Sequence, residues 1–201
     1  TQRNTNYYQT EKSQISKDYM NRFPFLEHSE NVALALKVCE IAGVKTQIAL
    51  DGMVHTSPDP GALKIMELNI EGNHIHFINA FAANDPFSTL MIWHMVEERL
   101  SSRQSCVFLN TRQDRRYRTK QLIELCYQKI KPGILIIRGD NIDSLVPENR
   151  NSKIELKILP LSSTPQDIIK NISSLDNYFV MGIGNMVGWG DSFVMELKTY
   201  E

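Results

Sequence analysis

The chain has few cysteines and no long apolar run. Its cysteines, Cys39, Cys106 and Cys126, are odd in number, lie far apart and form no CxxC pair. This usage argues against a disulfide framework and favours a reducing compartment. No apolar stretch approaches the roughly 20 residues that span a bilayer, and the N-terminus has no charged-then-apolar signal sequence. The sequence predicts a soluble chain, and its start at Thr1 indicates a fragment or a processed piece.

Neither sign of charge dominates the chain. Its 201 residues carry 22 Lys and Arg against 23 Asp and Glu, a net charge of −1. The field of the whole molecule therefore gives no reason to expect a nucleic acid partner, and any anion site must be local. Hydrophobic residues at 42% and charged residues at 22% are ordinary values for a globular protein. A chain of this length can bury one good core or two small ones.

The common catalytic motifs are also absent from the sequence. There is no G-x-x-x-x-G-K-[ST] loop to cradle a triphosphate, so this polypeptide alone should not hydrolyse ATP. The segment GIGNMVG is one residue off the dinucleotide fingerprint and lies near the end of the chain, which argues against NAD. No HExxH motif, zinc-spaced Cys/His cluster or nucleophile elbow is present, so no metal site is predicted.

The N-terminal part reads as a polar lead-in followed by helices. Residues 1–22 are polar with little periodicity, which predicts peripheral strands or a loosely ordered segment. The segment HSENVALALKVCEIAG predicts a helix with Ser29 as its N-cap and Gly43 at its end. A second short helix is predicted from Thr46.

The strongest break in the chain is TSPDPG, residues 56–61, with two prolines and a glycine in six positions. We place a domain boundary there, with one unit at 1–56 and the other at 57–201, and interpret the break as a hinge.

Beyond this break, short apolar strands alternate with helices. Strands are predicted in ALKIMELNI, HIHFINAF, SCVFLN, GILIIRG, IELKIL and YFVMGIG, with helices from Pro86 to about Leu100, from about Asp114 to Lys131, and in PQDIIKNISSL. This alternation predicts an α/β fold, Rossmann-like, with a mostly parallel sheet covered by helices on both faces.

Ligands of such sheets bind outside the carboxyl ends of the strands. The segments that leave the predicted strands there are polar, glycine-rich or cationic: 79–85, 110–115, 138–140 and 182–190. Each of them alone is explained equally well by a solvated loop, but the four together favour a site.

The segment NTRQDRRYRTK, residues 110–120, gathers arginines at a strand-to-helix junction. Cations are disfavoured near a helix N-terminus, so local structure does not explain them and an anion would. The planar fork of arginine suits a carboxylate, and we predict that Arg112 and Arg115 bind one, with Arg116 as a spectator. Asp114 either caps the helix, which is the favoured alternative, or holds an arginine in place.

Five segments together resemble a known family. They are EHSENVALALKVCEIAGV, SPDPGAL, NAFAANDPFSTLMIW, NTRQDRRYRTKQL and GIGNMVGWGDSF, between residues 27 and 193. In this order they resemble the C-terminal half of the ligase subunit of poly-γ-glutamate synthases (PgsB/CapB), in the superfamily of Mur peptidoglycan ligases and folylpolyglutamate synthases. The resemblance implies that 1–56 is the tail of a central ATP-binding domain and 57–201 a C-terminal Rossmann-like domain.

The resemblance also implies a reaction. Members activate a carboxylate as an acyl phosphate with ATP and Mg²⁺, mostly held by the missing N-terminal half, and an amino group then forms an amide. The substrate here would be glutamate, polymerised through its γ-carboxyl for a capsule or secreted polymer. The implied partners are the rest of the enzyme and membrane synthase and export subunits. The implied location is cytoplasmic, at the inner face of the membrane.

Family roles carry over to a few positions. The resemblance places Asn31 at an adenine contact with His28 beside it, although Asn31 could equally satisfy backbone amides at a helix N-terminus. It also places Asn84 and Asp85 at the nucleotide, whereas the family aspartate that contacts ribose falls on Phe81. The residues implied for glutamate or polymer are Arg112, Arg115, Arg118 and Asn185.

Two other classes of function compete with the ligase. One is a non-catalytic Rossmann-like module that binds an anion. The other is a docking module of a membrane synthase complex, with Trp93, Trp189 and Phe193 as exposed anchors, although such aromatic residues are more often core.

Overall fold

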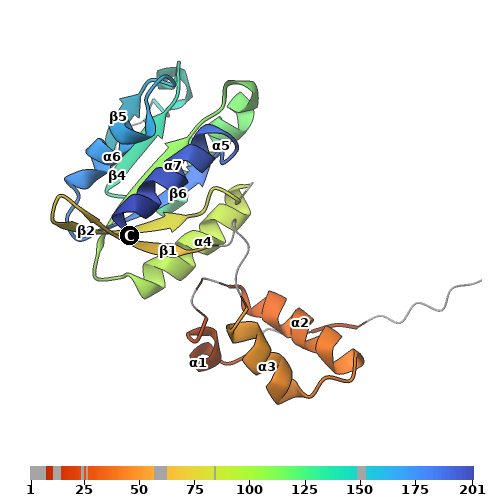
Figure 1. Ribbon diagram of the computed structural model, residues 1–201. Coiled ribbons are helices and arrows are strands. Elements are labelled where there is room, and N and C mark those ends of the chain that lie inside the picture. The colour runs from red at the N-terminus through yellow and green to blue at the C-terminus, as the bar shows by residue number, and fades with distance from the viewer. Residues whose placement is uncertain are drawn as a thin grey trace, which may run out of the picture. The chain divides into compact units, whose positions relative to one another are not determined.

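The computed structural model describes residues 8–10, 15–23, 25, 27–56, 63–83, 85–148 and 153–201. The chain divides into two compact units, Thr1–Ala62 and Leu63–Glu201 (Figure 1). The proline-rich break at 56–61, interpreted above as a hinge, lies outside the described residues except for Thr56.

The described part of the first unit is helical. It contains α1 (Lys17–Met20), α2 (Ser29–Ile41) and α3 (Thr46–Val54). The expectation of peripheral strands within residues 1–22 is wrong where the structure describes this segment, because α1 forms there. Ser16 caps α1, and the Tyr19 hydroxyl donates a hydrogen bond to the Leu50 carbonyl at 2.6 Å, which ties α1 to α3.

The ends of α2 differ in how well the sequence predicted them. Ser29 is not the N-cap: His28 occupies that position, and its side chain makes no capping bond. Gly43 does end the helix, with φ +79, and the following Val44 N–H donates to the Cys39 carbonyl at 2.9 Å. This left-handed turn is one that glycine adopts without steric cost.

The second unit is built on a six-stranded sheet in the order β1-β2-β6-β3-β4-β5. The strands are β1 (Ile65–Ile70), β2 (Asn73–Asn79), β3 (Gln104–Asn110), β4 (Ile134–Arg138), β5 (Glu155–Leu159) and β6 (Tyr178–Gly184). Only the β1–β2 hairpin pairs antiparallel among these strands. The predicted α/β fold with a mostly parallel sheet is confirmed.

In the described part of the second unit, four helices pack on this sheet: α4 (Pro86–Arg99), α5 (Arg116–Leu125), α6 (Pro165–Ser173) and α7 (Trp189–Leu197). A 3₁₀ turn, Gln113–Arg115, precedes α5, and a π-helical turn, Cys126–Ile130, follows it. The helix predicted from 114 to 131 is therefore continuous, but it changes from 3₁₀ to α and then to π geometry. Two short 3₁₀ turns, Asp143–Leu145 and Lys198–Tyr200, complete the unit. The sequence reading missed α7.

The helices cover both faces of the sheet (Figure 1). Helices α6 and α7 pack on one face, where Phe77, Phe81, Phe108 and Phe193 form the centre of the core. Helices α4 and α5 pack together on the other face, where Trp93 contacts Phe179. Trp93 and Phe193 are buried and Trp189 packs against the core, so these aromatic residues are core and not exposed anchors.

Two of the three cysteines are buried small hydrophobes, as predicted. Cys106 and Cys126 are fully buried, and burial raises the pKa of the Cys126 thiol to about 12. Cys39 is half-buried, and all three thiols are free. Within the described part of the chain, no helix has both the length and the apolar character needed to cross a bilayer.

Candidate functional site

The parallel register brings the carboxyl ends of four strands to one edge of the sheet. Asn110, the last residue of β3, is opposite Arg138 of β4 on one side and Gly184 of β6 on the other. Asn79, the last residue of β2, is opposite Gly182 of β6. The polar exits predicted from the sequence are therefore neighbours in space.

A buried polar frame supports this edge. The Arg138 guanidinium donates from Nη1 to Asn110 Oδ1 at 3.0 Å and from Nε to the Ser163 carbonyl at 3.0 Å. It also lies over the Trp189 ring, 4.2 Å from the centroid, and burial lowers its pKa. Because the Arg138 side chain is buried and hydrogen-bonded on several sides, we interpret it as a structural residue that stabilises this edge and not as a ligand contact.

The exit of β6 is fixed against β3. Asn110 Nδ2 donates to the Asn185 carbonyl at 2.6 Å, and the Asn185 N–H donates back to the Asn110 carbonyl at 2.8 Å. Gly184, between them, has φ +100, and a Cβ atom there would collide with the Asn110 carbonyl. Only glycine permits this close approach, which holds Asn185 at the edge.

The four residues predicted to bind glutamate or polymer lie together. Arg112, Arg115, Arg118 and Asn185 all line one shallow hollow of about 10 Å³ between the exits of β3 and β6, together with Asn110, Thr111, Thr119 and Gly184. We call it the arginine hollow. Arg112 precedes the 3₁₀ turn, Arg115 ends it and Arg118 lies in the first turn of α5, whereas Asn185 comes from the segment after β6.

Arg112, the residue before the 3₁₀ turn, has a partner inside that turn. Its Nε lies 2.7 Å from Asp114 Oδ1 and its Nη2 donates to Asp114 Oδ2 at 2.9 Å, which is a two-point ion pair. The favoured prediction that Asp114 caps the helix is wrong, because Asp114 lies inside the Gln113–Arg115 turn instead of before it. The alternative, that Asp114 holds an arginine, is what the structure shows.

Arg118 and Arg115 differ in their surroundings. Arg118 donates from Nη2 to the carbonyls of Ala83, at 3.2 Å, and Gly184, at 3.4 Å, and thereby links the exits of β2 and β6. Burial lowers its pKa, and the neighbouring Arg115 lowers it further. The exposed Arg115 side chain makes no hydrogen bond or ion pair with any residue that the structure describes.

The prediction that local structure leaves these arginines unexplained therefore needs correction. Arg112 is paired with Asp114, Arg118 with backbone carbonyls, and Arg116 with the loop after β4. Arg115 alone in this cluster, among the residues described, is left for an anion outside the chain.

The predicted nucleotide corner lies at the start of α4. Asp85 is the N-cap, and its carboxylate accepts from the Ser88 N–H at 2.9 Å and from the Ser88 hydroxyl at 2.7 Å. These bonds, with a smaller contribution from Arg118, hold the pKa of Asp85 below its ordinary value. Pro86 occupies the first turn, as predicted, whereas Asn84 lies outside the described residues.

Two neighbours of this corner bear on a nucleotide. Phe81, where the family aspartate aligns, is 1% exposed and packs in the aromatic core, so it offers no polar contact. Asn79 is buried at the end of β2, and its Oδ1 has no hydrogen-bond partner within the described structure. The sequence analysis assigns Asn79 only a place in a polar exit, because burial without a partner is not visible in a sequence.

His28 and Asn31 belong to the first unit. Asn31 Nδ2 donates to Glu27 Oε1 at 2.8 Å, and the same oxygen accepts from the His28 N–H at 2.7 Å. The alternative that Asn31 satisfies backbone amides is thus wrong. The Asn31 side-chain amide is hydrogen-bonded to the Glu27 carboxylate, and it is this carboxylate that accepts from a backbone N–H. An adenine contact of Asn31 stays a prediction.

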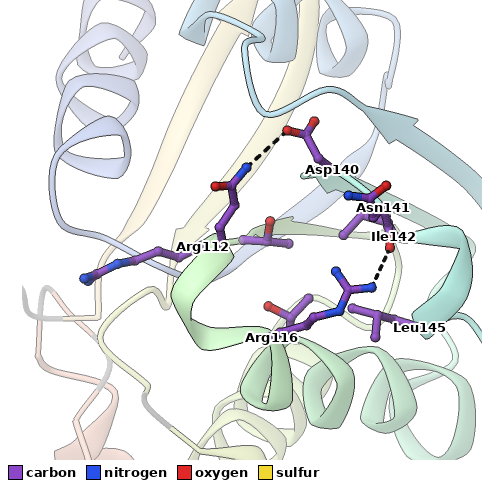
Figure 2. A pocket seen from close by; sticks show the side chains of 9 residues that line it. Arg112, Arg116, Asp140, Asn141, Ile142 and Leu145 are labelled. Carbon is purple, nitrogen blue, oxygen red and sulfur yellow. Dashed lines mark hydrogen bonds between the residues drawn. The ribbon is translucent and has the colours of Figure 1, made fainter.

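A larger cavity lies beside the arginine hollow, between the exits of β3 and β4 (Figure 2). It has a volume of about 330 Å³, and its polar lining includes Arg116, Gln113, Asp140 and Asn141. We call it the Asp140 cavity. The sequence predicts Arg116 to be a spectator and gives Asp140 only a place in the polar exit 138–140, after a buried strand at the same edge. Among the described residues, no group of three or more His, Cys, Asp or Glu side chains is placed to hold a metal ion.

Comparison with known proteins identifies the second unit. A family model described as the C-terminal domain of poly-γ-glutamate synthase CapB matches residues 65–200. The chain belongs to the CapB family. The matched range begins at β1 and ends in the last 3₁₀ turn, so it contains the whole sheet and both hollows.

Two curated CapB proteins are similar to this chain. The PGA synthase CapB of Bacillus subtilis strain 168 is 30% identical over 204 residues, which cover 100% of this chain and 52% of that protein. The capsule biosynthesis protein CapB of Bacillus anthracis is 32% identical over 197 residues, which cover 96% of this chain and 42% of that protein. The chain thus spans about half the length of these CapB relatives.

A solved structure agrees with the fold. MurF from Acinetobacter baumannii superposes with a TM-score of 0.65 at 13% identity, over 88% of this chain and 39% of that one. At this identity the likeness concerns the fold, which is that of a Mur ligase.

Proposed function

We propose that this chain is part of an ATP-dependent amide ligase that joins glutamate residues through their γ-carboxyl groups by way of an acyl phosphate. Two observations support the proposal: the CapB relatives, one of which is named a PGA synthase, and the arginine hollow at the carboxyl edge of the sheet. The proposal depends mainly on the arginine hollow, because a reaction between anions needs cations at the point where the anions meet.

The chemistry explains why such a hollow is useful. The triphosphate, the activated carboxylate and the growing polymer are all negatively charged, and the developing charge must be stabilised by fixed cations and donors. Arg118 is held rigidly by two carbonyls, while Arg115 is available to an incoming carboxylate. Arg112 can bind a second carboxylate oxygen only in competition with Asp114.

The cofactors of the proposed reaction are ATP and Mg²⁺. When bound, ATP supplies the phosphoryl group that activates the carboxylate. We assign one side of the nucleotide to the β2 exit, where Asp85, six residues after the end of the strand, is an exposed carboxylate and the buried Asn79 amide oxygen has no partner within the described structure. The phosphates and the metal need a loop that this sequence lacks, so we assign them to another part of the enzyme.

We further propose that residues 1–56 are the tail of the central ATP-binding domain and that 57–201 form the C-terminal domain. An apolar surface on the first unit supports this assignment: Leu34, Val38 and Ile41 of α2 and Ile48 of α3 are each more than half exposed. We assign the rest of the same enzyme as the occupant of this surface. Membrane synthase and export subunits, and a place at the inner face of the membrane, are proposed from the CapB resemblance.

The docking alternative is not favoured. Its proposed anchors, Trp93 and Phe193, are buried in the core of the second unit.

The test of the proposed function uses the complete ligase with Arg115→Lys. Lysine keeps the charge but loses the bidentate fork, so the glutamate KM should rise, or kcat/KM fall, about 10-fold or more, equal to ~1.4 kcal/mol, while the ATP KM changes little. Arg112→Lys should have a smaller effect, because Asp114 already binds that side chain. Arg99→Lys, at the far end of α4, is the matched control. Normal glutamate kinetics in the Arg115 variant would refute the assignment.

A further inference from the structure

We propose that the Asp140 cavity is a second amino-acid subsite, which takes one residue bearing both a free ammonium group and a carboxylate. This inference rests on the proposed function and extends it, since a polymerase of glutamate must distinguish a monomer or chain end from the interior of the polymer. The two charged residues on which it depends, Arg116 and Asp140, do not line the arginine hollow.

The cavity is distinct from the arginine hollow but adjacent to it. Thr111, Arg112 and Thr119 line both. Figure 2 shows that the Arg112 side chain runs away from the Asp140 cavity, whereas Arg116 points into it. The two spaces therefore share a wall, but Arg116 lines only the Asp140 cavity, and Arg115 and Arg118 line only the arginine hollow.

Arg116 is held in place at one side of the cavity. Its Nη2 donates to the Asn141 carbonyl at 3.1 Å and to the Ser144 hydroxyl at 2.7 Å. Guanidinium carries five N–H donors, and its Nε and Nη1 make no hydrogen bond to any described residue. A cation fixed on one edge with donors left on the other is preorganised for a carboxylate.

Asp140 stands on the opposite side of the cavity (Figure 2). Its Oδ1 accepts from the Leu161 N–H at 3.0 Å, which fixes the carboxylate. Among the described residues, its Oδ2 has only a long contact of 3.4 Å from Gln113 Nε2. Because a carboxylate can accept about four hydrogen bonds, Oδ2 retains the capacity to accept from an ammonium group.

This pairing of charges selects the class of ligand. A purely anionic ligand such as phosphate is opposed by Asp140, and a purely cationic one by Arg116, whereas an α-amino acid satisfies both. The volume of about 330 Å³ lies at the small end of ligand pockets. Among the lining residues only Ile142 and Leu145 are large and apolar, which offers no aromatic surface for a nucleobase.

The chemistry of the polymer further narrows the class of ligand that this cavity can bind. Within a γ-linked chain each nitrogen is an uncharged amide, so an interior residue has no ammonium group for Asp140. Free glutamate and the amino-terminal residue of the polymer have one. The Asp140 cavity thus recognises a free amino end, and the arginine hollow recognises carboxylates.

The experiment titrates the 201-residue chain with glutamate, in each enantiomer, and with N-acetylglutamate, and follows binding by calorimetry. For the better enantiomer, N-acetylglutamate should bind at least about tenfold more weakly, because it lacks the ammonium group. Asp140→Asn keeps an acceptor for the Leu161 N–H but removes the charge. It should weaken glutamate binding about tenfold and reduce the preference over N-acetylglutamate, which a merely structural role would not do. Arg116→Gln should weaken both ligands alike.

Asp143→Asn is the matched control, since Asp143 lies in the adjacent 3₁₀ turn but does not line the cavity. The inference is overturned if N-acetylglutamate binds as well as glutamate, if Asp140→Asn folds and binds like the wild type, or if the chain binds neither ligand. Should the complete ligase still turn over ATP in response to glutamate in any of these cases, the proposed function stands and only this subsite fails.

Discussion

Asp85 illustrates how one side chain can serve both structure and a ligand. Its carboxylate takes two hydrogen bonds from Ser88, which begin α4, and it also lies within the field of Arg118. The capping bonds use one lone pair of each oxygen and leave the others on an exposed carboxylate. Asp85 can therefore cap the helix and contact a nucleotide at the same time, and substitutions of Asp85 can distinguish the two roles.

We predict that Asp85→Ala destabilises the second unit by about 1 kcal/mol, because the first turn of α4 loses its cap. Asp85→Ser should keep most of the stability, since serine also caps helices, yet it lacks the charge. If Asp85 contacts the nucleotide, the serine variant of the complete ligase should bind ATP more weakly at nearly normal stability. Denaturant unfolding and a nucleotide titration check this. A serine variant with unchanged affinity would leave Asp85 as a cap only.

The cap also predicts a pH dependence. Hydrogen bonds from Ser88 hold the pKa of Asp85 below its ordinary value of 3.8 in the folded chain. Stability from a depressed carboxylate pKa is fully present above the unfolded value and is lost as the pH falls through the folded value. The difference in melting temperature between wild type and Asp85→Ala should therefore be constant near neutral pH and shrink below about pH 4. A difference that grows on acidification would contradict this assignment.

Sequence reasoning found the arginine cluster but not its partners. The excess of cations at a strand-to-helix junction was visible, and the structure does place Arg112, Arg115, Arg118 and Asn185 around one hollow. Which arginine is already paired depends on the 3₁₀ turn, which moves Asp114 off the capping position. The hydrogen-bond partner of Arg116 lies in a loop that is 25 residues away in the sequence. Such contacts follow from tertiary structure and leave no local pattern.

At the scale of elements, the strands and most helices were predictable because their signals are local. Buried parallel strands appear as apolar runs, and Pro86 marks the start of α4. Helix α7 was missed because Gly188 and Gly190 flank its start and resemble a loop. Gly188, with φ +80, is the N-cap, and its N–H donates to Asp191 at 2.8 Å. The two glycines therefore lie at the start of the helix and do not prevent it from forming.

Gly184 joins β6 to the arginine hollow, and its replacement tests that junction. Both Gly184 and Gly188 have positive φ, so an alanine at either position costs about 1 kcal/mol of backbone strain. Only at Gly184 does the new Cβ also meet the Asn110 carbonyl. We predict that Gly184→Ala destabilises the unit by about 1–3 kcal/mol more than Gly188→Ala, measured by denaturant unfolding. Equal losses would show that β6 can move away from β3 at little cost.

At the scale of the whole molecule, the chain combines an α/β unit with a unit whose described part is helical. The CapB family match covers the first of these and not the second. We predict that the purified chain has no ATPase activity, because no segment can bind the β- and γ-phosphates through a glycine-rich loop and a lysine. A steady-state phosphate-release assay checks this. Hydrolysis that a substitution within this chain abolishes would contradict it.

The apolar surface of the helical unit gives the last prediction. Ile48 is 63% exposed on α3, so Ile48→Lys should change the stability of the isolated chain by no more than about 0.5 kcal/mol. If the preceding part of the enzyme covers this surface, the same substitution buries an unpaired charge in the complete protein and should cost several kcal/mol there. Gln47→Lys, at the neighbouring exposed position, should be mild in both proteins. Equal effects of Ile48→Lys in the chain and the complete ligase would show that the surface faces solvent, and the assignment of residues 1–56 to the central domain would lose its structural support.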